Sequence, residues 1–165
     1  MSNDDDDRTA LHQDGRCDVV VEIPRGSQNK YEATDEGVIW FDRRLGGPAG
    51  FPGDYGYVIG AVGEDGDALD ALILLDEATF PGVHVRCRVL GAYSLEVGGE
   101  PETKLIVVAE ADHHSSHLKD LRDLPEAFLD ELDAFFAAYR MLESTSVEVR
   151  ERQGRDAAVA VLTGP

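Results

Sequence analysis

Residues 55–77 read YGYVIGAVGEDGDALDALILLDE, and this stretch carries the pattern that decides the fold. Two short runs rich in Val, Ile, Leu and Tyr flank an acidic turn that contains glycine. Short runs of this composition, bounded by Gly and Asp, are typical of β-strands. The sequence therefore predicts two strands joined by a turn at residues 63–67.

Similar runs lie on both sides of this stretch. They are DVVVEIP at residues 18–24, GVIWFD at 37–42, VHVRCRVLGAYSL at 83–95 and TKLIVVAEA at 103–111. Turns with Gly, Pro and Asp separate the runs, and no helical crossover lies between them, which favours an antiparallel barrel or sandwich. We expect six strands before residue 112.

The spacing of apolar residues changes at residues 123–143, DLPEAFLDELDAFFAAYRMLE. Leu, Phe and Tyr recur there at intervals of three and four, which predicts a helix with one apolar stripe. Asp123 and Glu126 have the spacing of a capping box at its start. An alternating segment, SVEVRE, and a short tail, DAAVAVL, follow. The predicted plan is a β-barrel of five or six strands with one main helix packed on it.

The chain has 165 residues and a mass of 18.0 kDa, which is the size of one domain. Its 33 acidic and 15 basic side chains give a net charge of -18. This charge disfavours binding to nucleic acid, which needs a basic face, and docking to an anionic membrane. We therefore expect neither nucleic acid nor membrane as a partner.

The N-terminal residues, MSNDDDDRTA, begin an acidic segment with few apolar side chains. Residues 1–16 are predicted to form a disordered acidic arm, and residues 17–165 a single domain. The start lacks the basic and apolar regions of a signal peptide, and no apolar run reaches the roughly 20 residues that span a bilayer. Cys17 and Cys87 show no metal-ligand spacing and are interpreted as plain thiols. A cytoplasmic location is expected.

The acidic turn is the densest chemical signal in the chain. Asp65, Asp67 and Asp70 repel one another, and a divalent cation would relieve that repulsion. Carboxylate oxygens favour Mg²⁺, Mn²⁺ or Ca²⁺ over Zn²⁺. An EF-hand loop does not fit, because Leu69 and Asp70 occupy positions that need a ligand and a glycine. Taken alone, the turn is equally compatible with a solvated acidic loop.

Two further segments add to this signal: VEIPRGSQNKYE at residues 21–32 and FDRRLGGPAGFPGDYGY at 41–57. The elements E-I-P...K-Y-E, D-R...P-x-x-Y-G and D-G-D-x-x-D occur in that order. In this the chain resembles the soluble, family I inorganic pyrophosphatases from about residue 18 to residue 143. The D-G-D-x-x-D element, preceded by P-x-x-Y-G, is the most specific part of the resemblance.

The resemblance implies an OB-like five-stranded β-barrel with flanking helices and, by analogy with bacterial members, a homohexamer. It implies hydrolysis of inorganic pyrophosphate to two phosphates by water activated by Mg²⁺, with Mn²⁺ as the alternative ion. It also implies roles for twelve residues: Asp67 as the catalytic base; Asp65, Asp70, Glu102, Glu22 and Glu32 as metal ligands or their supports; and Lys30, Arg43, Tyr55, Lys104, Tyr139 and Arg140 as phosphate-binding residues.

Some positions depart from the family pattern. Phe51 stands where the family usually has Tyr, and Arg140 where it has Lys. In the segment that usually reads D-E-x-G-x-D-x-K, the first Asp is Val97 and the second is Glu102. Since valine cannot ligate Mg²⁺, weaker binding of one metal ion is expected. Two alternatives therefore stay open: a same-fold hydrolase of another phosphoanhydride, and a catalytically weak metal- or phosphate-binding member.

Trp40 and Phe41 are adjacent aromatic residues in the run at residues 37–42. No basic groove accompanies them in the sequence, so a platform for stacking nucleic-acid bases is disfavoured. We interpret them as packing residues.

Overall fold

The computed structural model describes residues 12–46, 50–140 and 143–164. Its strands are β1 (Arg16–Ile23), β2 (Asn29–Ala33), β3 (Ile39–Arg44), β4 (Asp54–Val62), β5 (Ala68–Ile73), β6 (His84–Val97), β7 (Glu100–Ala109) and β8 (Val147–Gln153). Its helices are α2 (Glu126–Ala138) and α3 (Arg155–Thr163), with short 3-10 turns η1 (Gln13–Gly15), η2 (His113–Ser115) and η3 (Leu121–Asp123). Residues 1–11 of the predicted arm lie outside the described ranges, so that part of the arm remains a prediction. Gln13–Gly15 form η1 and Arg16 begins β1, so the described secondary structure starts before the predicted boundary at residue 17.

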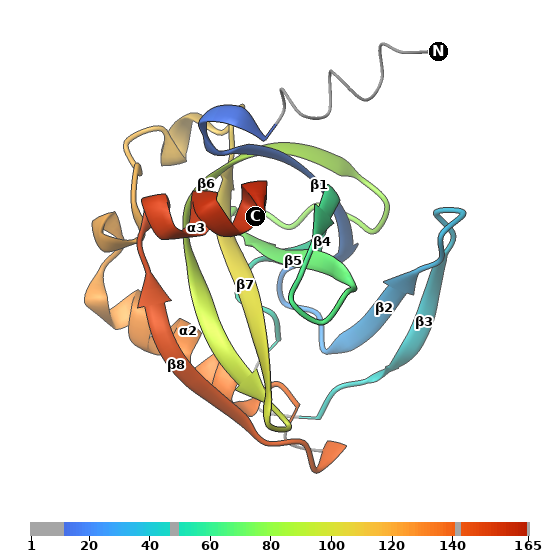
Figure 1. Cartoon of the computed structure of the whole chain (residues 1–165). Helices are drawn as coiled ribbons and strands as arrows, with labels where there is room; N and C mark the ends of the chain where they lie inside the picture. The colour runs from blue at the N-terminus through green and yellow to red at the C-terminus, as the bar shows by residue number, and fades with distance from the viewer. Residues whose placement is uncertain (1–11, 47–49, 141–142, 165) are drawn as a thin grey trace.

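Five strands form a closed ring in the order β1-β4-β5-β7-β6, which pairing between β6 and β1 completes (Figure 1). β8 extends the sheet from β6. The pairs are antiparallel except for β5 and β7, which run parallel. The prediction of an OB-like five-stranded barrel is confirmed, while the expectation of an entirely antiparallel barrel is wrong at this one pair.

A glycine allows β1 and β4 to approach closely. Gly56 pairs with Val21, and a Cβ atom at this position would lie 1.8 Å from the carbonyl oxygen of Val20. No side chain larger than hydrogen fits at that distance. The glycine of the P-x-x-Y-G element therefore serves the pairing of two barrel strands, which also fixes the neighbouring Tyr55.

β2 and β3 form a two-stranded hairpin that stands apart from the ring (Figure 1). The strand β2 was not predicted from the sequence, because its residues NKYEA are too polar to form an apolar run. On β3, Trp40 is 64% exposed and Phe41 59% exposed. The interpretation of both as packing residues is not supported for the core of this chain, since the hairpin leaves the ring. Phe41 makes an edge-on contact with the ring of Tyr31 at 6.0 Å between centroids, and Trp40 and Phe41 both remain more than half exposed.

The predicted helix is present as α2, which is shorter than the run at residues 123–143. Its apolar stripe packs on the barrel through Leu129, Leu132 and Phe136, all of them buried. The predicted capping box of Asp123 and Glu126 is wrong. Asp123 instead forms a capping box with Asp120 around η3, and Pro125 immediately precedes α2.

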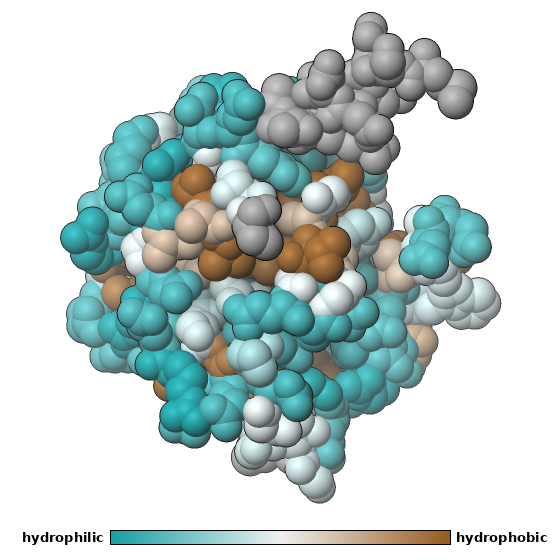
Figure 2. Space-filling view, viewed as in Figure 1, coloured by the Kyte–Doolittle hydropathy of each residue, from teal (hydrophilic) through white to brown (hydrophobic). Residues whose placement is uncertain are grey.

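The core lies on both sides of the sheet. One cluster, packed beneath α2, includes Tyr93 and Phe136, and the other, to which all five ring strands contribute and which α3 covers, includes Val19 and Leu162. In the view of Figure 2 the surface is largely hydrophilic, with a hydrophobic area over α3. Within the described ranges, no helix has the length and apolar character needed to cross a membrane.

Candidate active site

A cavity of about 630 Å³ opens between the ring, the β2–β3 hairpin and the end of α2. All twelve residues to which the sequence analysis gave a role line it. They come from β1 (Glu22), β2 (Lys30, Glu32), β3 (Arg43), β4 (Tyr55), the β4–β5 turn (Asp65, Asp67), β5 (Asp70), β7 (Glu102, Lys104) and the segment after α2 (Tyr139, Arg140). The fold thus gathers segments that are up to 118 positions apart in the sequence.

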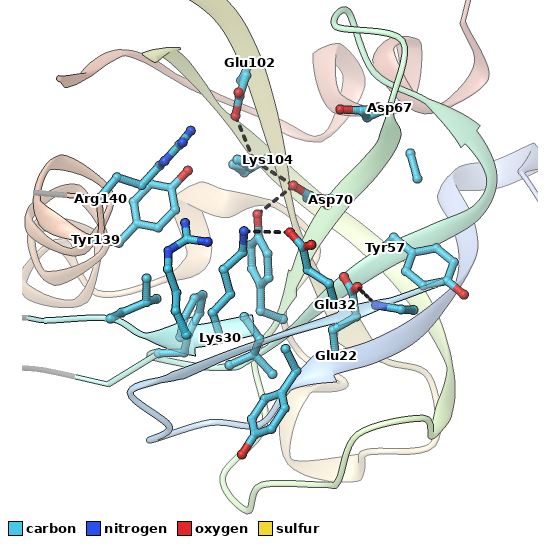
Figure 3. A pocket seen from close by; sticks show the side chains of 18 of the residues that line it. Glu22, Lys30, Glu32, Tyr57, Asp67, Asp70, Glu102, Lys104, Tyr139 and Arg140 are labelled. Carbon is cyan, nitrogen blue, oxygen red and sulfur yellow. Dashed lines mark hydrogen bonds and ion pairs between the residues drawn. The ribbon is translucent and has the colours of Figure 1, made fainter. Parts of the chain in front are cut away.

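At the floor of the cavity, Lys104 joins two acidic side chains (Figure 3). The parallel register of β5 and β7 places Asp70 opposite Lys104, so their side chains share one face. Lys104 Nζ donates to Asp70 Oδ2 at 2.7 Å and lies 3.0 Å from Glu102 Oε2. The hydroxyl of Tyr55 donates to the same Asp70 oxygen at 2.8 Å.

Burial and charge act in opposite directions on these groups. Burial alone would lower the pKa of Lys104, but the adjoining Tyr55 and Asp70 outweigh it and raise that pKa well above its usual value. Burial raises the pKa of Tyr55 well above its usual value, and the Asp70 carboxylate adds to the rise. At neutral pH the site therefore holds a protonated Lys104 and an uncharged Tyr55 hydroxyl.

Glu22 on β1 and Glu32 on β2 form the side of the cavity where the ring meets the hairpin. A Glu22 Oε2 atom accepts a hydrogen bond from the Ala33 backbone N–H at 2.7 Å, and Lys30 Nζ donates to Glu32 Oε1 at 2.7 Å. Burial raises the pKa of Glu22 to about 7, and the nearby Asp70 and Glu32 carboxylates act in the same direction. Glu22 is therefore poised to gain or lose a proton near neutral pH.

The turn between β4 and β5 presents Asp67 at the mouth of the cavity. The Asp65 Oδ1 atom accepts the backbone N–H of Asp67 at 3.0 Å, which fixes the turn. The Asp67 carboxylate is exposed and makes no hydrogen bond or ion pair within the described part of the chain. In Figure 3 it lies across from Tyr139 and Arg140.

The opposite wall carries the two arginines. Arg43 lies one residue before the end of the hairpin strand β3, and Arg140 follows α2. The ring of Tyr139 stacks on Phe135 at 5.6 Å between centroids. Burial raises the pKa of Tyr139 above its usual value. Each guanidinium group is bound to Glu143, a cavity residue to which the sequence analysis gave no role.

Asp35 is a second acidic lining residue that the sequence analysis missed. Glu143 could have been found from its i,i+3 spacing to Arg140, whereas Asp35 lies in the hairpin turn with no local signal. With these two, the lining carries eight carboxyl groups and four basic side chains. Such a cavity repels a phosphate anion unless cations offset the excess of negative charge.

The carboxyl groups have the oxygen chemistry that hard divalent cations prefer. No three His, Cys, Asp or Glu side chains in the described ranges are already gathered around one metal position. Asp70 and Glu102 instead share the ammonium group of Lys104. The donor set fits a divalent cation by its chemistry and by its excess charge.

Two departures from the family pattern have clear places in the structure. Phe51 is buried against Tyr55 and lines the cavity, so the missing hydroxyl belongs to the site. Val97 is only 5% exposed, belongs to the apolar core and does not line the cavity. The expectation that a carboxylate is missing at Val97 itself therefore finds no support in the geometry. The residue opposite Glu102 on β6 is Leu95, which is also buried.

A family model described as inorganic pyrophosphatase matches residues 19–164. The chain belongs to the inorganic pyrophosphatase family. A curated inorganic pyrophosphatase from Streptomyces coelicolor is 46% identical over 147 residues, covering 87% of this chain and 89% of that protein. One from Halalkalibacterium halodurans is 40% identical over 146 residues, covering 88% and 90%.

Solved structures of inorganic pyrophosphatases share the fold. The enzyme from Thermus thermophilus superposes with a TM-score of 0.87 at 38% identity, covering 91% of this chain and 88% of that one. The enzyme from Helicobacter pylori gives 0.87 at 35% identity, covering 92% and 91%. Membership of the pyrophosphatase family confirms the resemblance drawn from the motifs and implies a divalent metal cofactor.

Proposed function

We propose that this chain hydrolyses inorganic pyrophosphate to two phosphates in a reaction that depends on Mg²⁺, with Asp67 as general base. The observation that supports it best is the single cavity lined by all twelve residues, in a chain of the inorganic pyrophosphatase family. The surplus of carboxyl groups over basic side chains fits an anionic substrate only together with cations.

Asp65, Asp70 and Glu102 would hold the metal ions, supported by Glu22 and Glu32. Their all-oxygen chemistry favours Mg²⁺, with Mn²⁺ as a second choice. When bound, such ions offset charge on the phosphates and make a coordinated water more acidic.

The side chains around the metal ligands accept the proton from water and bind the phosphate oxygens. The Asp67 carboxylate accepts a proton from the attacking water, whose oxygen forms a bond to one phosphorus atom while the bridging P–O bond breaks. Lys30, Arg43, Lys104 and Arg140 hold the phosphate oxygens and stabilise the charge on the departing phosphate. The Tyr139 hydroxyl, uncharged at neutral pH, donates a hydrogen bond to the same oxygens. The Tyr55 hydroxyl, also uncharged, donates to Asp70 in the structure and reaches a phosphate oxygen when its single proton turns away from that carboxylate.

The test measures phosphate release from pyrophosphate over a series of Mg²⁺ concentrations. We expect Asp67→Asn to fold normally, because the Asp67 carboxylate has no hydrogen bond or ion pair to lose among the residues that the structure describes, and to reduce kcat by about 10²- to 10⁴-fold. Glu64→Gln is the matched control, since Glu64 lies in the same turn without lining the cavity. Activity without metal, an unaffected Asp67→Asn enzyme, or turnover of only other phosphoanhydrides such as ADP would contradict the proposal.

We also propose a homo-oligomer, a hexamer by the family resemblance, that works in the cytoplasm. The basis for the oligomer is family membership alone. Sedimentation equilibrium of the purified chain distinguishes a hexamer from a monomer.

A further inference from the structure

Glu143 lies between the two arginines on the wall opposite the acidic turn. Its Oε1 atom accepts hydrogen bonds from Nε of Arg43, at 3.0 Å, and from a terminal nitrogen of the same guanidinium group. Its Oε2 atom accepts from Nε of Arg140 at 2.8 Å. One carboxylate thus uses both oxygens to bind two cationic side chains.

The contact joins two parts of the fold that no strand ladder connects. Arg43 lies on the β2–β3 hairpin, and Glu143 follows α2, 100 positions later in the sequence. The Glu143 side chain is 18% exposed and lines the cavity together with both arginines. Burial would raise the pKa of Glu143, but the hydrogen bonds from Arg43 and Arg140 outweigh it and lower that pKa, so the carboxylate stays ionised.

Two guanidinium groups side by side repel each other, and each belongs to a long side chain with many rotamers. The carboxylate between them removes the repulsion and restricts both side chains. Within the described residues, the two terminal nitrogens of Arg140 make no hydrogen bond. Those donors stay available to a phosphate group in the cavity.

We propose that Glu143 is a positioning residue, which holds Arg43 and Arg140 side by side in the arrangement that receives a phosphate group of pyrophosphate. It acts through the two arginines and does not itself contact the substrate. This inference rests on the proposed function, in which both arginines bind phosphate. Without Glu143, pyrophosphate must itself order the side chains of Arg43 and Arg140 when it binds. The free energy needed for this ordering weakens the binding of pyrophosphate.

The experiment compares Glu143→Gln and Glu143→Asp in the full-length protein with saturating Mg²⁺. For Glu143→Gln we expect KM for pyrophosphate to rise about tenfold, with kcat within about threefold of the unmodified enzyme. Glu143→Asp keeps the charge and should restore part of the affinity. Glu96→Gln is the control, because Glu96 also binds an arginine, Arg150, but lies outside the cavity lining.

A second arm separates positioning from direct contact and from a structural effect. In a chain with both Arg43→Ala and Arg140→Ala, adding Glu143→Gln should leave KM unchanged, because the groups it positions are gone. A further rise in KM there, or an unchanged KM in the single variant, would overturn the proposal. If the double arginine variant itself binds pyrophosphate normally, the phosphate-binding roles fail first, and the two failures are thereby distinguished. Thermal unfolding verifies that each variant is folded. If Glu143→Gln does not fold, the KM of Glu143→Asp alone tests the proposal.

Discussion

Lys104 is only 5% exposed and forms ion pairs with Asp70 and Glu102, while Tyr55 and Asp70 raise its pKa and keep it charged. Removing either carboxylate leaves an incompletely compensated charge in the cavity floor, which is far more costly than losing a surface ion pair. The three residues therefore behave as one unit. A change at any one of them alters the position of the other two, so single substitutions there will not give additive effects.

Glu22 makes the stability of the metal-free protein depend on pH. Its pKa is about 7 in the folded chain against 4.5 for the ordinary carboxyl group, so the folded state holds this proton more tightly than the unfolded state. The free energy of unfolding should therefore fall as the pH rises from about 4.5 to about 7. We expect a loss of about 2 kcal/mol after allowance for partial exposure.

Urea unfolding in EDTA at a series of pH values measures this loss. In the Glu22→Gln variant, the free energy of unfolding should lose the part of its pH dependence that comes from Glu22. Glu148→Gln, an exposed change on β8, should keep the full pH dependence. Parallel pH profiles for the unmodified chain and Glu22→Gln would show that the Glu22 carboxyl group titrates normally.

Residues with a role in the motifs were predictable from the sequence because each motif places a carboxylate or a cation at a fixed point on a strand or turn. All twelve line the cavity. Glu143 was not assigned a role, because its bond to Arg43 spans 100 positions and depends on the hairpin meeting the end of α2. Motif spacing also does not reveal that Val97 is buried in the core and lies outside the cavity lining.

At the scale of elements, apolar runs predicted the barrel strands well, since alternate burial on two faces needs many Val, Ile and Leu residues. β2 escaped detection because it pairs only with β3 outside the ring and has little apolar surface to bury. The parallel pairing of β5 and β7 could not be predicted either, because the residue pattern does not encode strand direction.

Gly56 offers a direct test of the β1–β4 pairing. We expect Gly56→Ala to lower the free energy of unfolding by about 3 kcal/mol or more, since the added methyl group meets the Val20 carbonyl and the strands must separate. Activity should fall as well, because Tyr55 moves with the strand.

Gly63→Ala is the control for this change. An added Cβ atom at Gly63 comes closest to the flexible end of Asp65, at 3.3 Å, and makes ordinary contacts with the Asp67 carbonyl oxygen at 3.6 Å and Leu69 at 4.0 Å, so chemical denaturation should detect a smaller loss. Equal losses in the two variants would mean that the close approach of β1 and β4 does not limit stability.

At the scale of the whole molecule, the cavity lies between the ring, the β2–β3 hairpin and the end of α2. The ring alone does not fix the positions of the hairpin and of α2. The barrel supplies Tyr55, Asp70 and Lys104 through ladder register, whereas the hairpin supplies Lys30 and Arg43 from outside the ring. The relative placement of ring, hairpin and α2 thus determines whether the acidic floor and the basic wall face one substrate. Sequence motifs identify these groups but not the distances among them.

The exposure of Trp40 on the hairpin has a consequence for spectroscopy. Trp40 is the single tryptophan of the chain and is 64% exposed, so its fluorescence reports on the hairpin surface and not on the barrel core. We expect an emission maximum already close to that of tryptophan in water, which shifts little when urea unfolds the protein. Circular dichroism should record the same unfolding in full, because the buried ring strands lose their ladders. A large red shift that coincides with the circular dichroism transition would instead place Trp40 in an apolar environment, as an interface between subunits would provide.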